Sequence, residues 1–258
     1  KIGLIADQSK LARKSAQILK QKYHFAKTSQ ADILIVLGGD GFMLRQLHNF
    51  FATGQKLYGI NCGTIGFLMN QFEVSLTHLD DLEQRILNAD ETKVHPLFME
   101  SETRLDKKVK QNYAFNEVVL SRQNQQAAHI NIKIDRVTAI ERLICDGVMV
   151  ATPAGSTAYN LAVNGPILPF GSDVVALSAI SPFRPRRWNG AILKDTRHIT
   201  ITAQDTQKRP VNADADSVRV SDVRMISVSK ITDRWSSLLF DPDKTLEERI
   251  FKEQFTTV

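Results

Sequence analysis

Short apolar runs alternate with segments of helical periodicity through the first third of the chain. Strands are expected at 2–6, 32–39 and 56–63, where apolar residues dominate. Helices are expected at 10–21, 41–51 and 74–89, where apolar side chains recur every three or four residues. This order of elements predicts a parallel, Rossmann-like sheet covered by helices, which is an α/β domain.

Glycine-rich turns follow two of these expected strands. One turn, "GGDG", spans residues 38–41, and the other spans residues 63–66. Ligands of parallel α/β sheets bind beyond the carboxyl ends of the strands. Both turns therefore stand where a binding site is expected.

The pattern changes near residue 92, where strand-like runs begin to follow one another with few helices between them. A helix-like interruption lies at 155–163, and later strands are expected at 173–180, 198–203, 217–220 and 225–231. This succession predicts a β-rich, sandwich-like domain. We expect an α/β domain at 1–91, the β-rich domain at 92–240, and a tail at 241–258, helical over 244–254, that joins the first domain.

The composition is that of an ordinary globular chain. Of its 258 residues, 43% are hydrophobic and 24% are charged, and this length is sufficient for a sizeable core. No apolar run approaches the roughly 20 residues that span a bilayer, and no leader-like segment opens the sequence. A cytoplasmic protein without a membrane partner is therefore expected.

The net charge, the cysteines and the histidines limit the kinds of ligand that are expected. The net charge of +5 suits nucleic acid or a small anionic substrate, but the basic residues are mostly scattered, so nucleic acid is not expected. Cys62 and Cys145 are expected to be buried thiols. The six histidines show no ligand spacing, so no protein-bound transition metal is expected.

The GGDG turn combines a phosphate cradle with a carboxylate. Gly38, Gly39 and Gly41 allow close approach of a ligand to the backbone, and the start of a helix attracts anions. Asp40 should repel phosphate, so it either holds a cation that bridges phosphates or accepts a proton from an attacking hydroxyl. The alternative is a tight turn in which Asp40 caps the helix. The turn is neither a Walker loop nor a dinucleotide GxGxxG motif.

The β-rich region offers further candidate residues. Asn116 and Glu117 interrupt the apolar strand "FNEVVL", so they either have specific partners or end the strand in solvent. The segment 145–169 begins with an Asp-Gly turn and continues with small hydroxyl residues before a helix. Ser156 or Thr157 either caps that helix or helps to hold a base or sugar, and Tyr159 either contacts a ligand or packs in the core.

Taken together, these segments resemble the NAD kinase family. The match rests on "GGDG" (38–41), "NCGTIGFL" (61–68), "NE" (116–117) and "DGVMVATPAGSTAYNLAVNGPILP" (146–169), in that order. Lipid kinases and phosphofructokinases carry turns related to GGDG, so this motif alone is weak evidence, whereas the ordered set is specific. The resemblance implies an N-terminal α/β domain and a C-terminal β-sandwich-like domain, with the active site between them.

The resemblance also implies an activity and a set of site residues. The activity is transfer of the γ-phosphoryl group of ATP, or of polyphosphate, to the 2′-hydroxyl of the adenosine ribose of NAD. Asp40 is the implied general base, Gly38, Gly39 and Gly41 make room for phosphates, and Mg²⁺ bridges the nucleotide. The implied NAD contacts are Phe67, Asn116, Glu117, Asp146, Thr157, Ala158 and Tyr159. A homodimer or homotetramer is implied as well.

The chain departs from the family pattern at three places. Phe42 stands where many members have threonine, and "SPFRPRRWNG" (181–190) replaces a histidine-containing segment, so no role is assigned to Arg184, Arg186 or Arg187. "VNADADS" (211–217) replaces a common Asp-Gly-Gln, so none is assigned to Asp214 or Asp216. The sequence does not decide which phosphoryl donor is preferred, or whether NAD or NADH is the preferred acceptor. The alternatives are a lipid or sugar kinase that shares the GGDG turn, and a non-catalytic NAD(P)-binding sensor.

Overall fold

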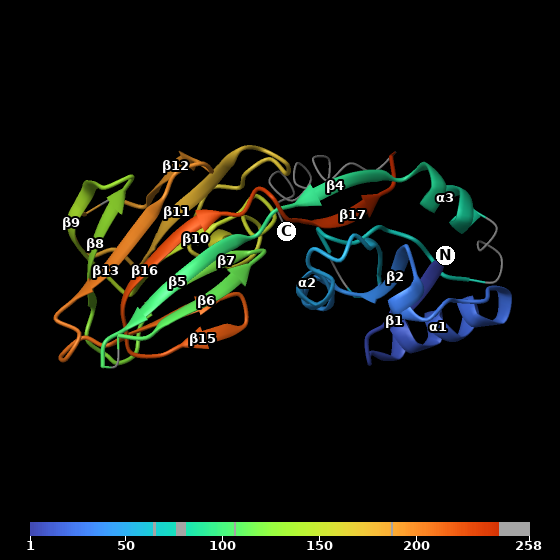
Figure 1. Ribbon diagram of the computed structural model, residues 1–258, viewed down its shortest axis with the longest axis horizontal. Coiled ribbons are helices and arrows are strands. Elements are labelled where there is room, and N and C mark those ends of the chain that lie inside the picture. The colour runs from blue at the N-terminus through green and yellow to red at the C-terminus, as the bar shows by residue number, and fades with distance from the viewer. Residues whose placement is uncertain (64–65, 76–80, 106, 187, 243–258) are drawn as a thin grey trace. The chain divides into compact units, whose positions relative to one another are not determined.

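The computed structural model describes residues 1–63, 66–75, 81–105, 107–186 and 188–242. The chain divides into two compact units. The first contains Lys1–Val94 and the residues from Asp233 onward, and the second contains His95–Thr232. Figure 1 labels helices and strands of both units.

The first unit is built on a five-stranded sheet with the order β1-β2-β3-β17-β4. Strands β1, β2, β3 and β17 are parallel, and β4 pairs antiparallel with β17 at one edge. The strands are β1 (Ile2–Ala6), β2 (Ile33–Gly38), β3 (Lys56–Asn61), β4 (Asp90–Val94) and β17 (Ser236–Phe240). The helices are α1 (Lys10–Lys22), α2 (Asp40–Asn49) and α3 (Leu82–Asn88), with a short 3₁₀ turn at Thr28–Gln30.

The helices lie on both faces of this sheet. Helices α1 and α3 share one core with Tyr58 and Ile60 of β3. Between these two residues, Gly59 faces the other way, and a Cβ built on it would lie 2.6 Å from the end of the Met43 side chain of α2. After α1 the chain first pairs in parallel with the outer edge of β1, through the bridge between Gly3 and Ala26, and only then continues to β2. The steps across α1 and α2 therefore run in opposite directions along the sheet with helices on opposite faces, so the two connections have the same hand, as is usual in parallel sheets.

The expected strands and the first two helices of this unit are present, but two segments differ from the sequence pattern. Helix α3 covers only the end of the expected helix 74–89, of which 76–80 lie outside the described residues. Strand β17 pairs with β3, so residues 236–240 belong to the first sheet, although their position after a run of strands grouped them with the β-rich domain. The expected tail helix at 244–254 lies outside the described residues.

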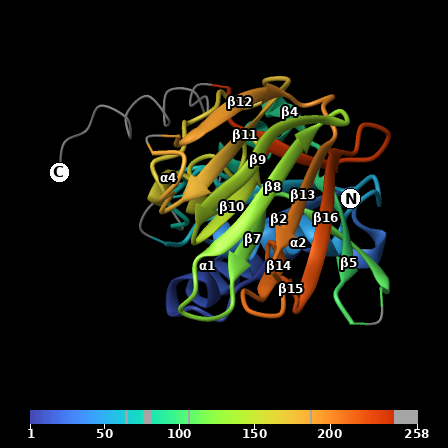
Figure 2. The same cartoon turned by 90° about the vertical axis from the view of Figure 1, so that its left-hand side faces the viewer.

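The second unit contains two six-stranded antiparallel sheets. One has the order β12-β11-β10-β7-β14-β15 and the other β6-β5-β16-β13-β8-β9, and both are visible in Figure 2. The strands are β5 (Leu97–Thr103), β6 (Val109–Ala114), β7 (Glu117–Arg122), β8 (Ala128–Ile134), β9 (Val137–Cys145), β10 (Gly147–Ala151), β11 (Val174–Ile180), β12 (Gly190–Lys194), β13 (Ile199–Gln204), β14 (Val211–Ala215), β15 (Val218–Val220) and β16 (Val223–Lys230).

A single apolar core joins the two sheets of the second unit. Alternate side chains of β7 and β10, such as Leu120 and Val148, pack in one cluster with Ile130 and Ile201 of β8 and β13. This inward alternation is what a sandwich requires of its strands. The predicted fold class, an α/β domain with a parallel sheet followed by a β-sandwich-like domain, is confirmed. Among the described residues, no helix is long and apolar enough to cross a membrane.

Candidate functional site

The GGDG turn connects the end of β2 to the start of α2. Gly38 is the last residue of β2, and Gly39 is the N-cap of α2. A Cβ on Gly38 would lie 2.8 Å from the Phe42 side chain, so packing explains this glycine. A Cβ on Gly39 or Gly41 meets no atom of the described chain within 4 Å, and neither residue has a positive φ. Neither packing nor backbone strain explains these two glycines, which leave open space beside the turn.

Asp40 does not cap its own helix. It is the first residue of α2, and no side chain caps that helix. Its carboxylate accepts hydrogen bonds from the backbone N–H groups of Phe67, at 2.7 Å, and Leu68, at 3.0 Å. These two bonds hold the carboxylate at the carboxyl end of β2. The capping alternative for Asp40 is therefore wrong, and Phe67 is brought beside Asp40.

The 61–70 loop, described except for residues 64 and 65, lies against the glycine turn. The Cys62 N–H donates to the Gly38 carbonyl at 2.7 Å. Gly66 is required by the carboxylate itself, because a Cβ there would lie 2.9 Å from Asp40 Oδ1. Gly66 ends the second glycine turn expected from the sequence, whereas Leu68 had no predicted role, although it lies inside the motif that carries the family resemblance.

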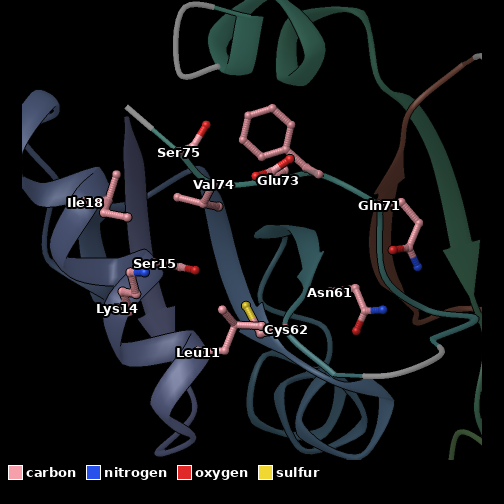
Figure 3. A pocket seen from close by; sticks show the side chains of 11 residues that line it. Leu11, Lys14, Ser15, Ile18, Asn61, Cys62, Gln71, Glu73, Val74 and Ser75 are labelled. Atoms are coloured by element: carbon pink, nitrogen blue, oxygen red, sulfur yellow. The ribbon is translucent and has the colours of Figure 1, made fainter. Parts of the chain in front are cut away.

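A cavity of about 750 Å³ opens beside this loop (Figure 3). Its walls combine apolar side chains with a few polar ones, which is the usual chemistry of small-molecule pockets. The lining residues come from α1, the end of β3 and the segment 71–75. Half-buried Cys62 faces this cavity, and burial raises the pKa of its thiol. Cys145 is buried as expected, and burial raises its pKa to about 12, so neither thiol is a strong nucleophile at neutral pH.

In the second unit, the Asn116-Glu117 pair stands where β7 begins, against the segment that follows β10. The Thr152 N–H donates to the Asn116 carbonyl at 2.9 Å, and the Thr152 hydroxyl donates to the Phe115 carbonyl at 2.6 Å. Gly155 lies so close that a Cβ on it would fall 2.2 Å from the Asn116 carbonyl oxygen. The pair and the start of "TPAGSTAY" therefore form one compact arrangement.

Asp216 organises the backbone of this pair. It lies in the turn between β14 and β15 with a φ of 48°. Its carboxylate accepts the backbone N–H groups of Phe115 at 2.7 Å, Asn116 at 3.0 Å and Glu117 at 3.1 Å. Asp216 has no role that the sequence predicts, because the late family motif is altered here. An aspartate in a strand-to-strand turn was the one available signal.

Two polar atoms of the pair are buried without a hydrogen-bond partner among the described residues. They are Asn116 Oδ1 and Glu117 Oε2. Burial, and secondarily the negative charge of Asp216, raises the pKa of Glu117 to about 7. Unpaired buried polar atoms are costly, and a perturbed carboxyl group beside them is typical of functional sites. This cluster is thus the candidate ligand site of the second unit.

The segment after Thr152 is fastened by its own side chains. The buried Ser156 hydroxyl donates to the Pro153 carbonyl at 2.8 Å and accepts the Leu168 N–H at 3.0 Å. Ser156 therefore does not cap α4 (Tyr159–Ala162), whose N-cap is Ala158 and which has no side-chain cap. Thr157 and Ala158 are half-buried just before this helix. Tyr159 is 44% exposed, so it lies outside the core and is accessible to a ligand.

Asp146 is not brought to this cluster within the chain. It precedes β10, whereas Glu117 pairs with Ala151 at the other end of β10. Five residues of strand separate the two positions, which is about 17 Å. The Asp146 carboxylate instead forms an ion pair with Arg122, with 2.7 Å between Asp146 Oδ1 and Arg122 Nε. Arg184 and Arg186 are exposed, and Arg187 lies outside the described residues.

Comparison with known families and proteins gives one consistent match. The model of the ATP-NAD kinase N-terminal domain matches residues 6–92, and that of the ATP-NAD kinase C-terminal domain matches residues 115–231. A curated NAD kinase of Xylella fastidiosa (strain 9a5c) is 46% identical over 255 residues, covering 99% of this chain and 96% of the relative. An NAD kinase of Brucella suis biovar 1 (strain 1330) is 44% identical over 256 residues, covering 98% and 96%.

Two solved structures share the fold. The crystal structure of yeast NADH kinase complexed with NADH gives a TM-score of 0.79 at 19% identity, covering 98% of this chain and 86% of the yeast chain. The NAD kinase from Archaeoglobus fulgidus in complex with ATP gives 0.73 at 20% identity, covering 98% and 97%. At these identities the likeness establishes the fold alone.

Proposed function

Because this chain belongs to the NAD kinase family, we propose that it transfers the γ-phosphoryl group of ATP to the 2′-hydroxyl of the adenosine ribose of NAD, with Asp40 as the general base. The chain is an enzyme that acts as an NAD kinase. A lipid or sugar kinase and a non-catalytic NAD(P)-binding sensor, the two alternatives from the sequence, are not supported.

The observation that carries the assignment of Asp40 is the way its carboxylate is held. Two backbone N–H groups of the 61–70 loop fix it at the carboxyl edge of the sheet, beside two glycines that face open space. A ribose hydroxyl is a poor nucleophile because its pKa lies far above 7. In the proposed step Asp40 accepts the 2′-hydroxyl proton, the oxygen bonds to the γ-phosphorus, and the bond to the bridging oxygen of ADP breaks. A positioned base contributes roughly 10²–10⁴-fold to such a step.

The glycine turn is proposed to receive the phosphates of the donor. The first N–H groups of α2 point toward the turn, and the start of a helix favours anions. Gly39 and Gly41 carry no side chain that would fill the adjacent space. Alignment of donor and acceptor, together with charge neutralisation, supplies most of the remaining acceleration in phosphoryl transfer.

The second unit is proposed to hold NAD. Asn116 Oδ1 and Glu117 Oε2 are acceptors without partners among the described residues, so hydroxyl or amino groups of a bound nucleotide would satisfy them. Thr157, Ala158 and the exposed Tyr159 are proposed to contact the same dinucleotide, with Tyr159 able to stack on a ring. Phe67 and Asp146 keep their proposed roles toward NAD from the family resemblance.

A divalent ion is proposed to arrive with the donor. No group of three or more His, Cys, Asp or Glu side chains in the described part of the chain could hold a metal ion. Mg²⁺ commonly binds through one or two carboxylates together with substrate phosphates, so the residues present suit an ion carried by ATP. Such an ion neutralises phosphate charge. A homodimer or homotetramer and the use of polyphosphate are further proposals from the family resemblance, and a cytoplasmic location is proposed from the pattern of the sequence.

The activity is tested by incubating the full chain with ATP, Mg²⁺ and NAD and measuring NADP with a coupled assay. An NAD analogue that lacks the 2′-hydroxyl of the adenosine ribose is the matched control, and we expect no phosphorylated product from it. Absence of NADP with several donors and metals, despite measurable NAD binding, would contradict the proposed function and favour a sensor.

A further inference from the structure

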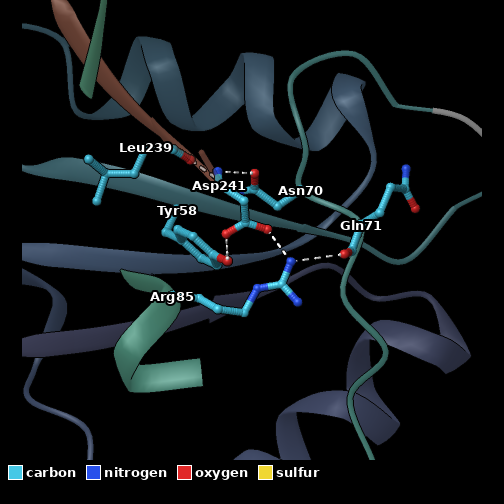
Figure 4. Close-up of polar contacts among 6 residues, drawn as sticks. All are labelled: Tyr58, Asn70, Gln71, Arg85, Leu239 and Asp241. Atoms are coloured by element: carbon cyan, nitrogen blue, oxygen red, sulfur yellow. Dashed lines mark hydrogen bonds and ion pairs between the residues drawn. The ribbon is translucent and has the colours of Figure 1, made fainter. Parts of the chain in front are cut away.

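A buried polar network lies at the end of the 61–70 loop, beside Asn70 (Figure 4). Asp241, directly after β17, is 4% exposed. Its carboxylate accepts the Tyr58 hydroxyl at 2.6 Å and forms an ion pair with Arg85 of α3. Burial, and then the hydrogen bond to Asp241, raises the pKa of Tyr58, so the hydroxyl stays protonated and keeps donating. The network joins β3, α3 and the end of β17.

Asn70 connects this network to the loop. It is fully buried, and its side chain accepts the Asp241 N–H at 3.0 Å and donates to the Leu239 carbonyl at 2.9 Å. Its backbone donates to the Gly59 carbonyl at 2.8 Å and accepts the Asn61 N–H at 2.9 Å. Four hydrogen bonds therefore fix one residue, and the loop begins and ends at the same place on β3.

The fixed end of the loop lies only two residues from the groups that hold Asp40. Leu68, whose N–H donates to the Asp40 carboxylate, precedes Asn70 by two positions. Two residues span at most about 7 Å of chain, so we expect a displacement of the Asn70 backbone to move the backbone of Leu68 by nearly the same distance. Between them Met69 is fully buried and packs against Gly59, which leaves little room for compensation.

We propose that Asn70 is a positioning residue for the phosphoryl-transfer step, and that Asp241, with Tyr58 and Arg85, holds Asn70 in place. The inference rests on the proposed role of Asp40. It goes further by assigning the position of the Asp40 carboxylate to a buried network outside the GGDG turn. Displacements of about 1 Å at a reacting group cost on the order of 10²-fold in rate, so a loosened loop should lower turnover strongly.

The first test is Asn70→Ser, which keeps a small polar side chain but cannot make both hydrogen bonds. We expect kcat to fall by about 10- to 100-fold while the KM for NAD changes little. The stability control is Leu19→Ala, which opens a cavity under α1 in the core of the same unit and removes none of the hydrogen bonds of Asn70 or Asp241. If its melting temperature falls comparably but its kcat does not, simple destabilisation is excluded.

A milder variant covers the case in which Asn70→Ser does not fold. Tyr58→Phe removes one hydroxyl and keeps the ring, and we expect a reduction of kcat in the same direction but several-fold smaller. In an Asp40→Asn background, either variant should add little further loss, because residues that act through one group are not additive. A full additional loss in that background would overturn the proposal.

Hydrogen exchange tests the inference independently of the activity. We expect amide exchange in the peptide that contains Phe67 and Leu68 to accelerate in Asn70→Ser, and not in Leu19→Ala, because those two N–H groups lose a fixed acceptor. Wild-type kcat and wild-type exchange in Asn70→Ser would overturn the inference. Failure of the wild-type chain to make NADP would instead contradict the proposed function, while the exchange result would still decide the positioning role.

Discussion

The carboxyl group of Glu117 gives the second unit a stability that depends on pH. Burial and then the charge of Asp216 raise its pKa from an ordinary 4.5 to about 7. Between these values the folded chain holds a proton that the unfolded chain has lost. The free energy of unfolding therefore falls as the pH rises from 4.5 to 7, and levels off above 7.

The size of this effect follows from the two proton affinities. Each tenfold difference in affinity between the folded and unfolded chains corresponds to about 1.4 kcal/mol, so the interval gives about 3 kcal/mol. Glu117→Gln has nearly the same shape and stays neutral at every pH. We expect this variant to match the wild type near pH 4.5 and to exceed its stability by up to about 3 kcal/mol at pH 8.

Denaturant unfolding of both proteins across this pH range measures the difference. The chain has two tryptophans, and Trp188 packs against the core of the second unit. With Trp235→Phe in both proteins, Trp188 fluorescence reports the second unit alone. A gap between the two proteins that stays constant from pH 4.5 to 8 would refute the reasoning.

Three further predictions concern single positions or ligands. Asp216→Asn should lower the free energy of unfolding of the second unit by about 2–3 kcal/mol, because charged acceptors of buried N–H groups are lost, and should weaken NAD binding measured by calorimetry. Asp214→Asn, which breaks a more exposed pair with Arg219, should cost less than about 1 kcal/mol and serves as the matched control. Gly41→Ala should leave the melting temperature unchanged or raise it slightly, because alanine favours helices by up to about 1 kcal/mol. The same variant should lower kcat/KM for ATP, because the added methyl group occupies space proposed for phosphates. Unchanged kinetics would contradict the phosphate cradle. EDTA should abolish NADP formation, reversibly on adding Mg²⁺, without shifting the melting temperature of the nucleotide-free protein; a shift would indicate a resident metal.

Local patterns in the sequence were sufficient to predict the fold class. Strand and helix periodicities are properties of neighbouring residues, so β1 to β3, α1 and α2 were expected near their observed positions. The same patterns cannot say which strands pair across long separations. Strand β17 is the example, because its "SSLLF" suits either sheet, and only the structure places it beside β3. The helix expected over 155–163 shortened to the single turn of α4.

Side chains that act on distant backbone account for most of what the sequence did not reveal at the site. Asp216 accepts hydrogen bonds from backbone N–H groups about a hundred residues earlier in the chain, and the side chain of Asn70 forms hydrogen bonds with the backbone of Leu239 and Asp241. Neither contact leaves a local pattern. Asp40 and the glycines around it became candidates because they lie in one turn, whose chemistry is readable from adjacent residues. Asp146 is the opposite case. It lies in the same sequence motif as other candidate NAD-binding residues, but the structure does not bring it close to Glu117.

Single-turnover phosphoryl transfer by Asp40→Asn, with saturating ATP, Mg²⁺ and NAD, tests most directly whether Asp40 is the general base. The matched control is Asp7→Asn, which removes a carboxylate that follows neighbouring strand β1 and pairs with Arg45. If Asp40 is the base, its variant loses about 10²–10⁴-fold in rate while NAD still binds with nearly unchanged affinity, and the Asp7 variant stays close to wild type. A near-normal rate in Asp40→Asn, or an equal loss in both variants, would contradict the account.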